Sequence, residues 1–318
     1  MLRRCSIWFG LLLAVATSAL AADVPAAPVC GRSCLRSFLD RYLDAVFRHD
    51  PSAAPLTATH RATENAADVP VGEAFWKLMT GYGDVQRRYF DTQTGNAAYF
   101  GHLKEGDKTD IVSVRIRISG DRIAEAEWTV AREGGFGMFE SAGLARNPPP
   151  ADQPLPKGQR SSRFIMISLA NGYFQSLQDH DGSWVPHDEK CERVENGVKV
   201  TFRPMPGNAA LSSAVAGAGV SAAAPTAAQE QLSGNCMDNF AMFKGAIAEA
   251  ALRRFPLVDE AAGVVLGATV FRRPAANSNR RNLLTEYFHT RNGRLYGVWA
   301  AMHYLEPSAP WSSGWENR

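Results

Sequence analysis

Two stretches of the chain carry the same pattern: YLDAVFRHDPSAAPLTATHRATEN at Tyr42–Asn65 and YFQSLQDHDGSWVPHDEKCERVEN at Tyr173–Asn196. They lie 131 positions apart and align without a gap, with seven of 24 positions identical. Chance matching at ordinary residue frequencies gives about one or two identities. A period of this length is too long for a solenoid repeat and has the size of a domain. The sequence therefore predicts a duplicated domain.

The sequence around each copy predicts the same order of elements. LRSFLDRYLDAVF (35–47) and RFIMISLANGYFQSL (163–177) place apolar residues at steps of three and four, which indicates amphipathic helices. DIVSVRIRISGDRIAEAEWTV (110–130) and NLLTEYFHTRNGRLYGVWAAMHYL (282–305) read as strand, tight turn and strand. We expect an α+β fold with two tandem domains, in each of which helices pack on a strongly curved antiparallel sheet.

The remaining segments divide the chain. MLRRCSIWFGLLLAVATSALA is a basic start, an apolar run and a small-residue cleavage site, which predicts a signal peptide and an exported protein. The expected parts are a signal peptide (1–21), a first domain (30–137), a Pro-rich linker (138–162) and a second domain (163–318) with an Ala/Gly/Ser-rich insert (205–234).

Charge and cysteine content narrow the function classes. The formal net charge is +2 and no Lys/Arg block stands out, so nucleic acid and anionic membrane are not the expected partners. Four cysteines follow the signal peptide, which permits three disulfide connectivities in an exported chain. We expect Cys30–Cys34 and Cys191–Cys236; a Cys34–Cys191 link between the halves, or a metal-binding CxxxC pair, is the alternative.

Two resemblances rest on these motifs. RYLDAVFRHD (41–50) followed by TENAADVPVG (63–72) resembles the opening of nuclear transport factor 2-like domains of the ketosteroid isomerase and polyketide cyclase branch. The mature chain also resembles an uncharacterised family of fungi and bacteria through CERVENGV (191–198), RRFPLVDEAAGVVL (253–266) and SGW (313–315). The first resemblance implies cone-shaped domains with a pocket at the mouth, present twice and packed as an internal pseudo-dimer.

The resemblance also implies a catalytic group in the first copy. Tyr42 matches a tyrosine that donates a hydrogen bond to a developing oxyanion, and Glu64 lies next to the position of an acidic strand residue that moves a proton. His60 precedes Glu64 by four residues, so both would face one side of a regular strand. In the second copy the His60 position is Cys191, which favours the first copy as the working one.

Asn65, Trp76 and Arg115 are the candidate substrate-binding residues. Asn65 stands where the family has its acid, and an amide cannot act as a base, so this departure argues against the family's isomerase reaction. Packing is the alternative for the repeated residues: buried core tyrosines, an Asn that completes a turn and a Glu that caps a backbone group. A solvated sheet face is the alternative for Arg115.

The sequence contains no metal-ligand cluster, Gly-rich phosphate loop, nucleophile elbow or nicotinamide fingerprint, so we expect no cofactor. The expected function is an exported lyase acting on a small hydrophobic or aromatic molecule by proton abstraction followed by elimination or retro-aldol cleavage. An isomerase with the same pocket and a non-catalytic ligand-binding module are the alternatives, because one fold hosts all three.

Overall fold

The structure, a computed structural model, describes residues 30–202, 234–238, 240–244, 246–273 and 281–316. The predicted signal peptide and, apart from Gly234, the predicted insert therefore lie outside the described residues. Both expected disulfides are present, Cys30–Cys34 and Cys191–Cys236.

The two halves have matching elements. The first contains α1 (Arg32–Phe47), η1 (Pro51–Ala53), β1 (Leu56–Glu64), β2 (Ala67–Val69), α2 (Phe75–Leu78), β3 (Gly81–Asp91), β4 (Asn96–Glu105), β5 (Lys108–Ser119) and β6 (Arg122–Ala131). The connection contains α3 (Ser141–Arg146) and η2 (Lys157–Gln159). The second contains α4 (Arg163–Asp179), β7 (His187–Glu195), β8 (Val198–Lys199), η3 (Phe240–Phe243), β9 (Glu249–Asp259), β10 (Val264–Arg272), β11 (Arg281–Arg291) and β12 (Arg294–Leu305).

The described strands form two six-stranded sheets of the same topology, in the orders β2-β1-β6-β5-β4-β3 and β8-β7-β12-β11-β10-β9. The expectation of purely antiparallel sheets is wrong. β1 runs parallel to β6, and β7 runs parallel to β12, so both sheets are mixed. The alternation of apolar and polar residues reports which face a side chain occupies but not the direction of its neighbour strand, so the sequence pattern could not reveal this.

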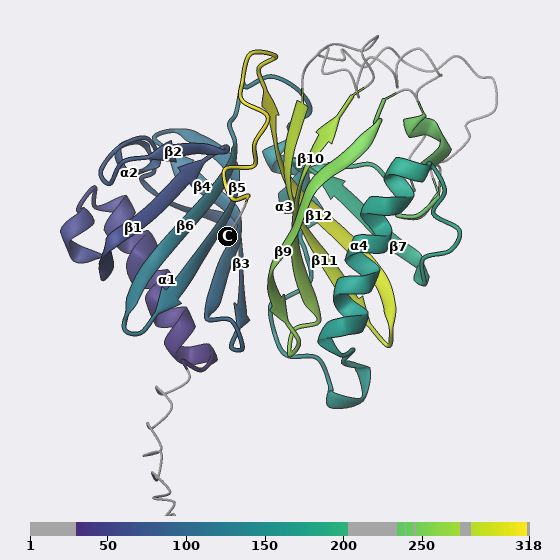
Figure 1. Ribbon diagram of the computed structural model, residues 1–318, viewed down its shortest axis with the longest axis horizontal. Helices are drawn as coiled ribbons and strands as arrows, with labels where there is room; N and C mark the ends of the chain where they lie inside the picture. The colour runs from purple at the N-terminus through teal and green to yellow at the C-terminus, as the bar shows by residue number, and fades with distance from the viewer. Residues whose placement is uncertain (1–29, 203–233, 239, 245, 274–280, 317–318) are drawn as a thin grey trace, which may run out of the picture.

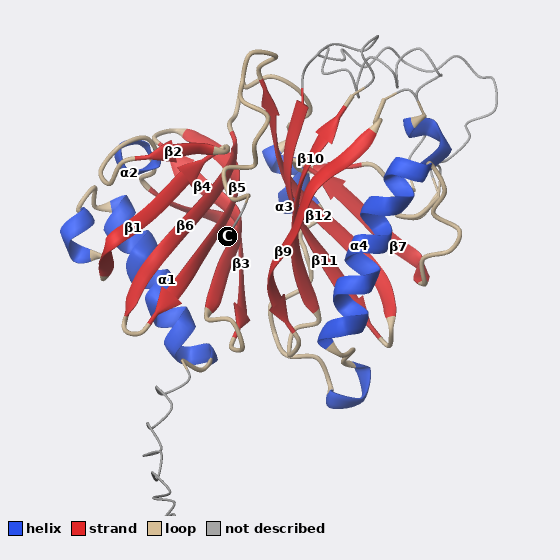
Figure 2. Ribbon diagram, in the orientation of Figure 1, coloured by secondary structure: helices blue, strands red, loops and turns tan. Residues whose placement is uncertain are grey.

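The two sheets pack against each other, and α1 and α4 cover their outer sides (Figure 1). Figure 2 shows the resulting order of helix, sheet, sheet and helix. Each sheet therefore has an inner face that packs against its own helix and an interdomain face that packs against the other sheet. The interdomain core combines apolar residues from both halves, including Tyr89, Phe100, Leu257 and Tyr287.

Reciprocal contacts at the interdomain face give the two halves an approximate two-fold relation. Asp91, at the end of β3, accepts a hydrogen bond from the Val258 backbone N–H at 2.9 Å and binds the Arg163 guanidinium. The matching contacts run the other way, from Phe90 N–H (2.9 Å) and Arg32 to Asp259. An isologous interface has this form, in which residue i contacts j and j contacts i. The two domains thus pack as an internal pseudo-dimer.

Most residues of the repeat have a structural role that is the same in both copies. His49 lies in the turn after α1 with a left-handed φ of 54°, and Asp50 accepts a hydrogen bond from the Ser52 backbone N–H at 3.0 Å. The second copy repeats both features with His180 (φ 60°), Asp181 and Ser183 (2.9 Å). These are the turn residues predicted from HDPS and HDGS.

The repeated prolines lie directly before β1 and β7, the strands that pair in parallel with β6 and β12. The Pro55 carbonyl accepts a hydrogen bond from the Ile123 N–H at 2.8 Å, and the Pro186 carbonyl accepts one from the Leu295 N–H at 3.0 Å. One contact joins the residue before β1 to β6, and the other joins the residue before β7 to β12. The repeat therefore encodes how the helix, the turn and the first strand enter the sheet.

Candidate functional site

The predicted residues Tyr42, His60 and Trp76 meet on the inner face of the first domain. The ring centroids of Tyr42 lie 5.5 Å from Trp76 and 6.3 Å from His60. Tyr42 is fully buried, and its hydroxyl accepts a hydrogen bond from Trp128 Nε1 at 3.3 Å. Burial raises the pKa of the Tyr42 phenol, so this group stays protonated.

Two polar atoms of this group have no hydrogen-bond partner among the described residues. His60 Nδ1 donates to the Ile123 carbonyl at 3.1 Å, while its buried Nε2 has no partner. Trp76 Nε1 is likewise buried without a partner. Burial lowers the pKa of His60, which makes the neutral imidazole the stable form.

Glu64 is engaged in structural contacts. Its Oε1 lies 2.7 Å from Arg132 Nη1, and its Oε2 accepts a hydrogen bond from the Phe75 backbone N–H at 3.1 Å. Asn65 binds the backbone of Val130 on both sides, accepting from its N–H at 2.8 Å and donating to its carbonyl at 3.3 Å. The Asn65 amide thus joins β1 to β6, which is the packing role considered in the sequence analysis.

Arg115 is not where the substrate-binding prediction requires it. It is only 4% exposed and lies on the interdomain face, where it binds Glu125 at 3.0 Å and Glu127 at 3.1 Å. Arg254 of the second domain also binds Glu127. The prediction of a common site with Tyr42 is therefore wrong, because Arg115 extends from the opposite face of the sheet, and the alternative of a solvated face is wrong as well.

The inner face of the second domain has a different set of side chains at the matching positions. Tyr173 takes the place of Tyr42, Glu195 that of Glu64, Arg193 that of Ala62 and Cys191 that of His60. The Tyr173 hydroxyl accepts a hydrogen bond from Arg193 Nη1 at 3.4 Å. Arg193 Nε lies 3.3 Å from Glu195 Oε1, an ion-pair contact without hydrogen-bond geometry.

Glu286 has no acidic counterpart in the first domain. It pairs in register with Gly267 and Ala300. Val114 occupies the matching place in the first sheet, where it pairs with Tyr99 and Trp128. Three apolar side chains, two of them large, are thus replaced by one carboxylate, one methyl group and one hydrogen atom.

Glu286 is an unusual buried acid. Its side chain is 1% exposed, and its Oε2 has no hydrogen-bond partner in the described part of the chain. Burial, and then the charge of Glu195, raises the pKa of Glu286 well above its ordinary range, and Arg193 opposes this only in part. The shift favours the neutral carboxylic acid, the form of Glu286 that can donate a hydrogen bond.

The cover over this group is also specific to the second domain. The Arg193 guanidinium lies 5.4 Å from the Phe240 ring and 5.0 Å from the Phe243 ring of η3. The Cys191–Cys236 disulfide ties the segment before η3 to β7. In the first domain α2 has the corresponding place, and its Trp76 packs on Tyr42.

Sequence reasoning missed Glu286, although a signal for it exists. Leu284, Glu286 and Phe288 alternate along β11, and Leu284 and Phe288 belong to the inner core of the second domain. An acid between two core positions of one strand face must be buried, paired or functional. Comparison with the first copy does not reveal this acid, because β5 carries Val114 at the matching position.

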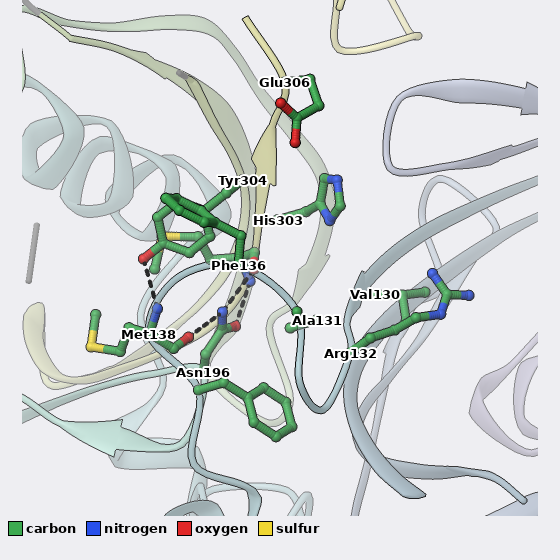
Figure 3. A pocket seen from close by; sticks show the side chains of 12 residues that line it. Val130, Ala131, Arg132, Phe136, Met138, Asn196, His303, Tyr304 and Glu306 are labelled. Carbon is green, nitrogen blue, oxygen red and sulfur yellow. Dashed lines mark hydrogen bonds between the residues drawn. The ribbon is translucent and has the colours of Figure 1, made fainter. Parts of the chain in front are cut away.

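A cavity of about 300 Å³ lies between the two domains, at the ends of β6 and β12. Figure 3 shows Val130 and Arg132 on one side of the cavity and Met138 and Asn196 on the other, with Glu306, Tyr304 and His303 above them. Asn196 fixes the wall of this cavity: it donates to the Met302 carbonyl at 2.7 Å and to the Met138 carbonyl at 3.0 Å.

The described residues contain no group of three or more His, Cys, Asp or Glu side chains placed to hold a metal ion. Over the same part of the chain, no helix has the length and apolar character needed to cross a membrane.

Comparison with known proteins found a similarity over part of the chain. Residues 159–302 match a domain of unknown function, DUF8021. No curated protein was found to match the chain. The matched span contains Tyr173, Arg193, Glu195 and Glu286, so the second-domain group lies entirely within it.

Proposed function

We propose that the protein is an exported, cofactor-independent lyase whose acid–base site lies on the inner face of the second domain. The observation that carries this proposal is Glu286: a fully buried acid with an unpartnered oxygen, next to Tyr173 and Arg193. A buried polar atom without a partner destabilises a protein by about 1–3 kcal/mol. Such an atom calls for an explanation, and a substrate oxygen that it binds would supply one.

The chemistry follows from the protonation states. Tyr173 accepts its hydrogen bond from Arg193, which leaves the Tyr173 hydroxyl proton to be donated. Neutral Glu286 offers a second proton. A phenol and a neutral carboxylic acid together stabilise negative charge that develops on a carbonyl oxygen. We assign this oxyanion-binding role to Tyr173 and Glu286, and the role of the proton carrier to Glu195.

A retro-aldol cleavage of a β-hydroxy carbonyl compound fits these roles. Glu195 removes the proton of the substrate hydroxyl, the carbon–carbon bond breaks and an aldehyde such as formaldehyde leaves. The electron pair of that bond moves to the carbonyl as an enolate, held by Tyr173 and Glu286, and the enolate carbon then takes a proton. Apolar surroundings, including Phe240 and Phe288, favour a small hydrophobic or aromatic substrate.

Two further parts of the proposal concern the fold and the location. We propose that each half is a nuclear transport factor 2-like cone; the repeated RYLDAVFRHD-type opening and the α+β sheets support this. Export is supported by the basic and apolar start of the sequence and by two disulfides, which suit an oxidising compartment.

Deuterium exchange tests the proposal without a known natural substrate. Aromatic ketones and β-hydroxy ketones are incubated with the protein in D₂O, and NMR follows exchange at the α carbon, cleavage and formaldehyde release. Glu286→Gln and Glu195→Gln are expected to lower the rate by about 10²–10⁴-fold, and Glu64→Gln is the matched control in the first domain. If Glu64→Gln abolishes turnover while both second-domain variants keep it, the site lies in the wrong half.

The product separates the reaction classes. Cleavage products identify a lyase, and a moved double bond identifies an isomerase with the same groups. Saturable binding of the ketones without exchange or cleavage would point to a ligand-binding module and overturn the enzymatic proposal.

A further inference from the structure

The cavity between the domains is built differently from either inner face. Its walls combine three aromatic rings, from Phe136, Phe139 and Tyr304, with two thioethers, from Met138 and Met302. Phe136 stands edge-on to Tyr304, with a centroid distance of 5.7 Å. Aromatic and thioether surfaces of this kind favour a flat aromatic ligand. About 300 Å³ is the lower end of the range of small-molecule pockets.

Most polar groups of the cavity already have partners. The Asn196 amide is bound to Met138 and Met302, and the Tyr304 hydroxyl accepts a hydrogen bond from the Met138 N–H at 3.3 Å. These contacts hold the connection after β6 against β12. These polar groups shape the cavity, and because they are already hydrogen-bonded they are not available to a ligand.

The charges around the cavity disfavour an anion. Arg132 is its cationic residue, but Arg132 lies 2.7 Å from the Glu64 carboxylate and 2.9 Å from that of Glu105. Glu306 adds a further carboxylate to the lining. Because two carboxylates already neutralise Arg132, this guanidinium offers an acidic ligand no net positive charge.

His303 supplies the polar contact that can orient a ligand. Burial, and then the nearby Arg132 charge, lowers the pKa of His303, which favours the neutral imidazole. A neutral imidazole that donates through one nitrogen accepts through the other. Figure 3 shows His303 between Glu306 and Arg132, on the wall of the cavity.

We propose that this cavity, at the ends of β6 and β12, is a second binding site, for a small uncharged aromatic molecule that carries a hydroxyl group. The ring lies among Phe136, Met138 and Tyr304, and the hydroxyl donates to His303. Because β6 and β12 belong to different domains, a bound ligand contacts both halves at once.

Three ligands with the same ring test the assignment by isothermal titration: β-naphthol, its methyl ether and β-naphthoate. We expect the mature chain to bind β-naphthol saturably. The ether, which lacks the donor, is expected to bind about tenfold more weakly, since one hydrogen bond contributes roughly a factor of ten. The naphthoate is expected to bind at least as weakly as the ether.

Variants place the ligand. His303→Leu is expected to weaken β-naphthol about tenfold and to leave the ether unchanged, which removes the difference between the two; His303→Gln, which keeps an acceptor, restores part of it. A purely structural role of His303 would weaken both ligands equally. Phe136→Ala is expected to weaken both about three- to tenfold, whereas Phe164→Ala, at an 80% exposed position of α4, is the surface control.

Glu286→Gln separates this site from the proposed catalytic one, because it should leave β-naphthol binding unchanged even if it abolishes turnover. The proposal is overturned if β-naphthol shows no saturable binding, if it binds wild type, His303→Leu and Phe136→Ala equally, or if the naphthoate binds most tightly.

Discussion

The two inner faces start from the same scaffold and differ in what fills them. In the first domain, Tyr42 is surrounded by Trp76 and Trp128, and the strand beside them carries Val114. In the second, Tyr173 faces Arg193 and Glu286. Since both sheets have the same strand order, the difference lies in the side chains on the strands and in the segment that covers them. It teaches that a duplicated backbone can keep one interior as a packed core and make the other ionisable.

The largest effect is expected when the missing acid is introduced into the first domain. Val114→Glu places a carboxyl group among Tyr99 and Trp128 without an arginine beside it, and an unpaired buried charge destabilises by about 3–5 kcal/mol. Urea denaturation measures this change, and Val114→Gln separates charge from size. The reverse change, Glu286→Val, should be neutral or stabilising; a loss as large as that of Val114→Glu would show that Glu286 is required for packing.

The disulfides provide the next comparison. Cys191–Cys236 closes a separation of 45 residues, whereas Cys30–Cys34 closes only four. On chain-entropy grounds the long loop contributes about 3–4 kcal/mol and the short one about 2 kcal/mol. The paired changes to serine should therefore lower the melting temperature more in the second domain. Equal losses would contradict the loop-length argument.

A third prediction concerns pH. Burial, and then a hydrogen bond that protonated Asp110 donates to the Glu105 carboxylate, raises the pKa of Asp110 to about 7. An acid whose pKa is raised on folding stabilises the native state below its unfolded pKa, near 4, and loses that contribution as the pH rises to about 7. Asp110→Asn imitates the protonated form, and the matching position in β11 is already Asn282.

We therefore expect the stability of wild type relative to Asp110→Asn to fall by on the order of 2 kcal/mol between about pH 4 and pH 8. Unfolding free energies from urea titrations at several pH values measure the difference. Parallel pH profiles for the two proteins would contradict the raised pKa.

The smallest effect is expected at the two repeated asparagines. Asn65 makes two hydrogen bonds to Val130, whereas Asn196 binds Met302 on both backbone groups and also Met138. Each such bond contributes about 1 kcal/mol. Asn196→Ala should thus lower stability by about 1 kcal/mol more than Asn65→Ala. A calorimetric comparison in which Asn65→Ala is the more damaging change would reverse the assignment.

Much of the scaffold was predictable because the repeat records it directly. The helix, the turn after it and the strand that follows are encoded by residues with local roles, such as His49 as a turn residue and Asp50 as the acceptor in that turn. The two disulfides were predicted as well. The parallel pairing of β1 with β6 was not, because strand direction depends on contacts distant in sequence.

The sequence analysis placed the candidate site in the first copy, whereas we propose it at the matching positions of the second. Tyr42, His60 and Trp76 do come together, while Glu64 is bound by Arg132 and Arg115 lies on the other face. The proposed group uses Glu286, whose Oε2 has no hydrogen-bond partner among the described residues, and the repeated stretch does not contain it. Similarity between copies reports what both need for folding, and a residue present in one copy only is invisible to it.

The reciprocal hydrogen bonds to Asp91 and Asp259 across the interface affect which substitutions this molecule can tolerate. In a homodimer of identical subunits, every substitution appears twice, so an acid placed in one interior is placed in both. Here the two-fold interface joins two halves of one chain, and each half has its own sequence and can change independently. One half can carry an acid that weakens its own core while the other stays fully packed and holds its neighbour in shape through the shared interface. The loss of folding stability is then confined to one domain, and the interdomain contacts of the other domain help to keep it folded.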